Sequence, residues 1–252
     1  MIMKNNKYMN KLLKISIIYI FHLISTSIAY SDHIKHEQRF LYIGAEAGLV
    51  EPVQHKFHHK ESNTNLTLKR SAMYSGKIGY SFYPGMAMEF STTYQPQYRL
   101  GYTLPQKHLS SSHSIPKTLG QTKMVSRIYM LNLIYDLKTI NSFIPFVIIG
   151  AGLATMKVKP TSSKWNLMNM EYFRVRKTQT NCFAWQFGVG ISKDITENFS
   201  IDTTAKLQVI HDIKAKYDTL DETTNKFVPS TPIKKTIGVG EFGIGFTYKL
   251  GI

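Results

Sequence analysis

The amino-acid sequence predicts an all-β protein, an eight-stranded antiparallel up-and-down transmembrane β-barrel over residues 40–252. Three observations favour this fold class. Apolar residues alternate with small or polar ones in successive segments, the loop lengths follow a regular order, and no run of about 18 apolar residues follows the leader. Because the bilayer core cannot satisfy backbone polar groups, a chain without an apolar helix spans it only as a closed barrel.

The first 29 residues are typical of a secretory signal peptide. The apolar region covers 12–24, and the positive region contains Lys4, Lys7, Lys11 and Lys14. Ser27 and Ala29 fit a small-x-small cleavage site, so we expect cleavage after Ala29 and a short polar lead-in over 30–39. The alternative, a membrane-anchoring helix, is less favoured because the apolar region is short for a span.

The first three predicted strands are 40–50, 71–83 and 86–98. Each alternates an apolar face with a small or polar face that carries one charged residue near its middle: Glu46, Lys77 or Glu89. Pro84 and Gly85 form a tight turn between the second and third strands.

The fourth and fifth predicted strands are 123–137 and 143–156. In the fourth, Arg127 interrupts the apolar face, which indicates a position at the level of lipid headgroups or a bulge. The fifth alternates only weakly, and Pro145 requires a place near the strand start or a bulge.

The last three predicted strands are 181–193, 199–212 and 235–250. The alternation is clearest at the end of the sequence, where the apolar residues are Phe242, Ile244, Phe246, Tyr248, Leu250 and Ile252. At ~3.3 Å per residue, this stretch tilted by ~45° crosses ~25 Å, which matches the apolar band of an outer-membrane barrel.

Long and short connections alternate along the chain. The long ones are 51–70, 99–122, 157–179 and 213–234, and the short ones lie at 84–85, 138–142 and 194–198. Because consecutive strands run up and down, all long loops fall at one end of the barrel and all short turns at the other.

The strand motifs at 146–154, 187–191 and 242–250 resemble those of the small eight-stranded outer-membrane barrels, such as the OmpA transmembrane domain and OmpX, and the surface-antigen and adhesin barrels of intracellular bacteria. The resemblance covers about 40–252 and includes no catalytic motif. It implies a protein of the bacterial outer membrane with extracellular loops and a structural or adhesin-type function.

The polar strand faces predict a lumen filled by ion pairs. An eight-stranded barrel has room only for side chains inside, and buried charges must be paired. The charged residues on these faces are Glu46, Lys77, Glu89, Asp136, Asp202, Lys206, Glu241 and Lys249. The alternative interpretation, a proton or ion path, is less favoured.

The net charge of +15 is concentrated in the leader and the long loops, and the third loop is the most basic. Its cations and aromatics predict a surface for a host-cell protein or an acidic glycan: Lys157, Lys159, Lys164, Trp165, Tyr172, Arg174, Arg176 and Lys177. The alternatives are a solvated loop or contact with anionic lipid headgroups.

The sequence carries few signs of catalysis or metal binding. His55, His58 and His59, like His108 and His113, lack Cys or carboxylate partners at ligand spacing, so we expect no metal and no cofactor. The single cysteine, Cys182, excludes an intramolecular disulfide. No nucleophile elbow, P-loop or HExxH motif occurs.

Two other function classes stay open at this point. A lipid-modifying barrel enzyme would use Ser126, His211 and Asp212 near the loop rim, although their spacing matches no motif. A soluble lipocalin-like binder would turn the apolar strand faces inward around a ligand. We expect instead a non-enzymatic monomer whose partners are outer-membrane lipid and a host-cell protein or acidic glycan, not nucleic acid.

Overall fold

The computed structural model describes residues 39–53, 56–59, 64–104, 107–110, 113–115, 118–165, 170–221, 226–229 and 233–251. The predicted signal peptide and the lead-in up to residue 38 lie outside the described residues. Among the described residues, no helix is long and apolar enough to cross a membrane.

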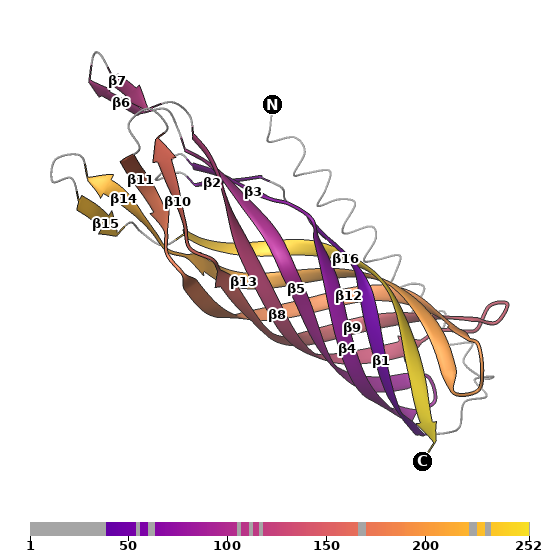
Figure 1. Cartoon of the computed structure of the whole chain (residues 1–252). Helices are drawn as coiled ribbons and strands as arrows, with labels where there is room; N and C mark the ends of the chain where they lie inside the picture. Colours follow the sequence, from indigo (N-terminus) through magenta and orange to yellow (C-terminus); the bar gives the residue numbers. More distant parts are fainter. Residues whose placement is uncertain are drawn as a thin grey trace.

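The eight predicted barrel strands are confirmed, and they form a closed antiparallel barrel (Figure 1). They are β1 (Phe40–Pro52), β4 (Ser71–Tyr83), β5 (Met86–Leu104), β8 (Thr118–Asp136), β9 (Phe143–Val158), β12 (Thr178–Asp194), β13 (Phe199–Ala215) and β16 (Ile233–Gly251). Each strand pairs with the next in this order, and β1 pairs with β16 to close the wall.

The register fixes the tilt of the strands. Paired residues followed once around the wall from Ile43, through Ile78, Phe90, Leu131, Ala151, Trp185, Val209 and Gly238, return to β1 at Val53. The return point is ten residues further along β1. For eight strands this stagger corresponds to a tilt of roughly 45°.

The short turns lie together at the end of the barrel that carries Phe40 and Gly251 (Figure 1). Gly85, after Pro84, has a φ of 73°, a conformation that glycine adopts without steric cost. Asn141 and Ser142 have φ values of 47° and 67°, as a hairpin turn with two left-handed residues requires. The sequence predicted all three turn positions.

The opposite end is more ordered than predicted, since the expected loops contain further strands. They are β2 (Lys56–His59), β3 (Thr64–Leu68), β6 (Lys107–Ser110), β7 (His113–Ile115), β10 (Thr161–Trp165), β11 (Met170–Val175), β14 (Tyr217–Asp221) and β15 (Lys226–Pro229). The barrel strands other than β4 are also longer than predicted, β5 most of all. These extensions lack apolar alternation, the signal by which the sequence identified strands.

The apolar strand faces point outward. Side chains along the wall are about half exposed, including Ile43, Ile78, Phe90, Leu131, Phe242 and Phe246. On the same strands the alternate positions are buried and polar, among them Glu46, Glu89 and Thr247. A lipocalin-like binder would require the reverse arrangement, so that alternative is wrong.

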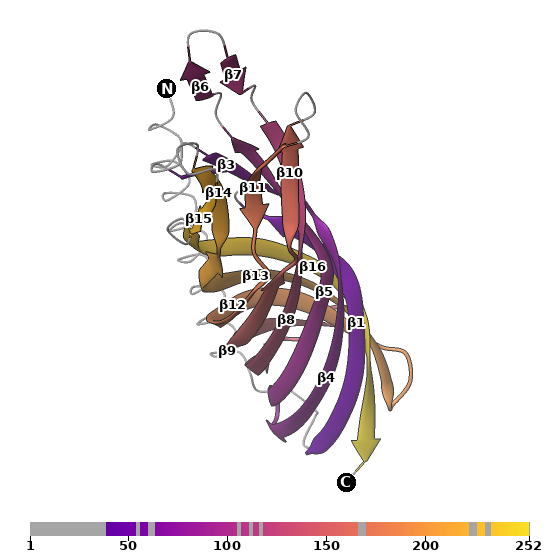
Figure 2. The ribbon, with the colours of Figure 1, turned by 60° about the vertical axis from the view of Figure 1, so that its left-hand side comes forward.

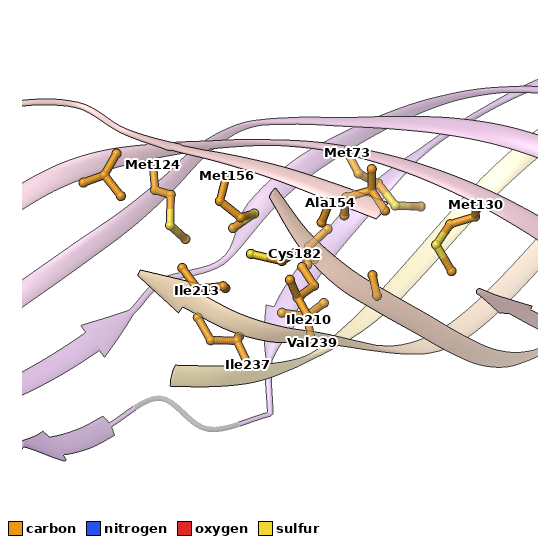
Figure 3. Close-up of a cluster of buried hydrophobic side chains, with 14 of the residues drawn as sticks. Met73, Met124, Met130, Ala154, Met156, Cys182, Ile210, Ile213, Ile237 and Val239 are labelled. Atoms are coloured by element: carbon orange, nitrogen blue, oxygen red, sulfur yellow. The ribbon is translucent and has the colours of Figure 1, made fainter. Parts of the chain in front are cut away.

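The barrel interior, here called the lumen, has two halves of different chemistry. The half near the short turns is polar, as predicted. The half near the loops is apolar and buried (Figure 3). The side chains of this apolar half include Met73, Met124, Met130, Ala154, Met156, Cys182, Ile210, Ile213, Ile237 and Val239. The sequence analysis expected charged and polar side chains throughout, and the apolar half corrects that expectation.

Candidate functional site

The polar half of the lumen is built around ion pairs, some of which join strands that are not neighbours. Lys77 on β4 lies 2.7 Å from the Asp202 carboxylate on β13, which also accepts a hydrogen bond of 2.6 Å from Thr247. Lys206 on β13 lies 2.9 Å from Glu46 on β1 and 4.0 Å from Glu241. The Lys77–Asp202 and Lys206–Glu46 pairs therefore join strands that are not adjacent in the barrel wall.

Uncharged polar side chains complete the network. Glu89 accepts hydrogen bonds from Asn132 at 3.0 Å and from the Tyr42 hydroxyl at 3.3 Å. Gln95 donates to Glu241 at 2.8 Å, next to the apolar half. Glu46, Glu89, Asp202 and Glu241 therefore each have a donor or cation, as burial of a charge requires, although Oε2 of Glu241 has no hydrogen-bond partner.

The turn end of the lumen contains a polar cavity of about 110 Å³. Lys249 lies 2.8 Å from Asp194 near its mouth, and Asp136 lines its wall. All eight charged residues that the sequence assigned to the lumen thus lie on its wall. The apolar half closes the lumen beyond the cavity toward the loops.

The third and fourth loops join in one four-stranded sheet outside the barrel, in the order β10–β11–β14–β15, here called the loop-side sheet (Figure 2). Its register places Lys164 opposite Glu171 and Arg174 opposite Asp218. Arg176 forms an ion pair of 2.7 Å with the buried Asp218 carboxylate. The hydrogen bond that Arg176 donates to Asp218 raises the pKa of the Arg176 guanidinium above its usual value.

The eight predicted loop residues are divided between the barrel wall and the loop-side sheet with its flanking residues. Lys157 is part of β9 and Lys159 follows it, so both lie at the barrel wall. Arg174 stacks over the Phe227 ring at 4.6 Å, and Arg176 and Lys177 are exposed. Lys164 and Trp165 belong to β10 and Tyr172 to β11, but their side chains lie outside what the structure describes.

The fourth loop also contributes cations beside the third loop, which the sequence did not indicate. Lys216 and Lys226 are exposed, and the Lys216 carbonyl accepts a hydrogen bond of 3.0 Å from the Arg176 amide. Arg176 and Lys216 are far apart in the sequence, so no local pattern could have joined them.

Ser126, His211 and Asp212 do not form a catalytic arrangement. Ser126 is fully buried on an inward-facing position of β8. His211 lies on the outer face, where its Nε2 accepts a hydrogen bond of 3.1 Å from Trp185 Nε1. Asp212 occupies a bulge with a φ of 54°.

The histidines that sequence analysis weighed as metal ligands are only partly described. His58 and His59 belong to β2, His108 to β6 and His113 to β7, whereas His55 lies outside the described residues. In the part of the chain that the structure covers, no three His, Cys, Asp or Glu side chains gather as a metal site.

No protein-family model matches the sequence. The chain is 58% identical over 178 residues to "Uncharacterized protein RP788" of Rickettsia prowazekii (strain Madrid E), a match that covers 71% of this chain and 99% of that protein. The chain belongs to the RP788 family. A shorter match, 45% identical over 58 residues, covers 23% of this chain and 85% of "Uncharacterized protein RP787" from the same organism.

This chain is also similar in structure to solved outer-membrane proteins. The outer membrane protein OprG from Pseudomonas aeruginosa has a TM-score of 0.52 at 14% identity, covering 88% of this chain and all of that protein. Neisserial surface protein A has a TM-score of 0.46 at 14% identity over 85% of this chain. The match to OprG and the closed wall of eight antiparallel strands show that the chain has the fold of the small outer-membrane β-barrels, which confirms the resemblance stated from its sequence.

Proposed function

We propose that this protein is a surface barrel of the bacterial outer membrane, which acts as a monomer and binds acidic groups of host or envelope components through its loop end. The outward apolar wall supports the membrane location, because such a wall is stable only in lipid or detergent. The loops face outside the cell in this proposal, since short turns lie at the periplasmic end of such barrels.

The observation that carries the binding proposal is the charge of the loop-side basic surface, defined as Arg174, Arg176, Lys177, Lys216 and Lys226. All five side chains are exposed. Among the described side chains of the loop-side sheet, the acidic one is Asp218, which is buried beside Arg176. A surface of one sign attracts polyanions and acidic protein surfaces and accelerates their association.

The proposed role is not enzymatic. Its chemistry is reversible electrostatic binding, and the only candidate triad is split between the two faces of the barrel wall, with Ser126 inside and His211 outside. A host-cell protein and an acidic glycan both present carboxylates or sulfates to such a surface.

Binding of the purified barrel to an immobilised sulfated glycan tests the proposal. We expect Lys177→Ser with Lys216→Ser to weaken binding several-fold, because exposed charges act within a Debye length of ~8 Å at physiological salt. Lys138→Ser with Lys193→Ser removes equal charge at the turn end and serves as the control. Equal binding by both double variants at low salt would contradict the proposal.

A further inference from the structure

Four cations form a second basic surface on the barrel wall. It adjoins the loop-side basic surface, because Lys159 follows Val158 and Lys177 precedes its partner Thr178. Lys123 and Arg127 lie on β8, Lys157 lies on β9 and Lys159 directly follows it, and all four are exposed. Each alternates with a buried residue, so all four face outward at the loop end of these two strands. We call them the β8–β9 basic patch.

The pairing of β8 with β9 places two cations of the patch directly opposite each other. The Lys159 amide donates a hydrogen bond of 2.8 Å to the Lys123 carbonyl, which continues the β8–β9 pairing by one step beyond Met124 and Val158. The two lysines are therefore directly opposite on one face, where side-chain Cβ atoms lie ~4.5–5.5 Å apart and like charges are destabilising. Lys157 follows on the same face, opposite Val125.

The described neighbours of the patch do not neutralise it. Gln179 lies opposite Lys157 on β12, and Tyr94 lies opposite Arg127 on β5, with the guanidinium 5.9 Å from the ring centre. Among the described side chains, none of the ion pairs involves these four cations. Four like charges in this arrangement favour an external anion.

The wall next to the patch restricts the kind of anion. On the same strands, toward the turn end, the outward residues are Tyr129, Leu131 and Leu153, which are 41%, 55% and 60% exposed. In the membrane this apolar surface is covered by acyl chains, so the anions nearest to the cations are lipid headgroups. An amphipathic lipid matches both, with its acidic headgroup at the cations and its acyl chains along the wall.

We propose that the β8–β9 basic patch binds the phosphate-bearing headgroup of an outer-leaflet lipid. Arg127 donates to the phosphate in the fork geometry that guanidinium groups favour. Lys123, Lys157 and Lys159 surround it, and the phosphate relieves their mutual repulsion. Two of these cations, Lys157 and Lys159, thereby serve a lipid site and not the host-binding loop to which the sequence assigned them.

The proposal rests on the membrane location in the proposed function and is independent of glycan binding. Native mass spectrometry of the detergent-solubilised barrel with added lipid A or phosphatidylglycerol tests it, with phosphatidylcholine as the lipid without net charge. We expect the wild type to retain the anionic lipids, and Arg127→Gln with Lys157→Gln to reduce retention by roughly tenfold. The control, Lys138→Gln with Lys193→Gln at the turn end, should retain them as the wild type does.

The unfolding midpoint gives a second readout, because added anionic lipid should act against the stability advantage of the variant over the wild type. In uncharged detergent, Lys159→Gln should raise the unfolding midpoint, because it removes repulsion from Lys123. With anionic lipid added, the wild type should gain more stability than the variant, because it binds the lipid more tightly.

Three results would overturn the lipid site. The first is equal retention of anionic lipid by the patch variant and the control. The second is equal retention of phosphatidylcholine and lipid A by the wild type. The third is displacement of bound lipid by millimolar inorganic phosphate, which would show that the patch recognises phosphate without the lipid. Failure of the membrane location would differ from all three, since the barrel would then fold without detergent.

Discussion

Replacement of Lys77 by Met should destabilise the folded barrel through the charge it leaves behind. Lys77 and Asp202 approach to 2.7 Å, and their side chains are only 10% and 6% exposed. After the change, Asp202 retains its hydrogen bond from Thr247 but loses its cation. A buried carboxylate without a partner charge is poorly solvated in the lumen.

The expected magnitude follows from the burial of both groups. Removing one partner of a buried ion pair costs about 3–5 kcal/mol of unfolding free energy. Asp202→Asn keeps an oxygen that accepts the Thr247 hydrogen bond and removes the charge, so it should rescue part of this loss in the Lys77→Met background. The double-mutant cycle should give a coupling of more than about 1 kcal/mol.

Urea unfolding in lipid vesicles measures these differences, with fluorescence of Trp185 on the outer wall as one probe and heat-dependent gel mobility as the other. The effect should change little with added salt, because buried pairs are screened weakly. A loss below about 1 kcal/mol for Lys77→Met, the level of a surface ion pair, would refute the packed lumen.

Three further predictions concern the wall and the interior. Phe246→Arg places a charge on the outer face in mid-strand and should cost ~2–4 kcal/mol, whereas Tyr83→Arg beside a turn should cost ~0–1 kcal/mol, and equal costs in vesicle unfolding would contradict the assigned face. Planar-bilayer recordings should show no stable large currents, because buried side chains block the lumen between its turn-end cavity and the loops; large single-channel steps from pure protein would show that the interior is open. An added Cβ at Gly48 meets the Phe242 carbonyl oxygen, so Gly48→Ala should slow or prevent assembly, whereas Gly238→Ala meets nothing closer than 3.8 Å and should assemble normally, as gel mobility would report.

The sequence carried enough information for the barrel itself. Alternation on the strands, Gly85 after Pro84 and the order of loop lengths each depend on local sequence, and they gave the strand count and the turn positions. The polar lumen residues followed from the same alternation, because Glu46, Lys77 and Asp202 lie on faces opposite to apolar ones.

The apolar half of the lumen had a weaker signal. Met73 lies on the small and polar face of its strand, and Ile128 and Met130 alternate with outward Tyr129 and Leu131, so that β8 reads as apolar on both faces there. A strand of that kind is buried on one side and in lipid on the other. Because the prediction used only the outward apolar face of each strand, it did not identify the second, inward apolar face.

The loop-side basic surface could not be predicted from local patterns. The contact between Arg176 and Asp218 joins residues 42 positions apart, and β10, β11, β14 and β15 are short strands that pair with each other. Lys157 was assigned to a loop for a different reason. The strand β9 continues beyond its apolar residues into positions whose outward side chains are polar or charged, so the alternation that marks a strand ends before the strand does.

Labelling of single cysteines on intact Gram-negative cells tests the membrane location and the loop orientation most directly. In a Cys182→Ser background, Lys216→Cys places a thiol beside the loop-side sheet, and Lys138→Cys places one at a short turn. A membrane-impermeant maleimide should label position 216 on intact cells and position 138 only after the outer membrane is permeabilised. Labelling of position 138 but not 216 on intact cells, or of neither before lysis, would contradict a surface barrel whose loops face outside.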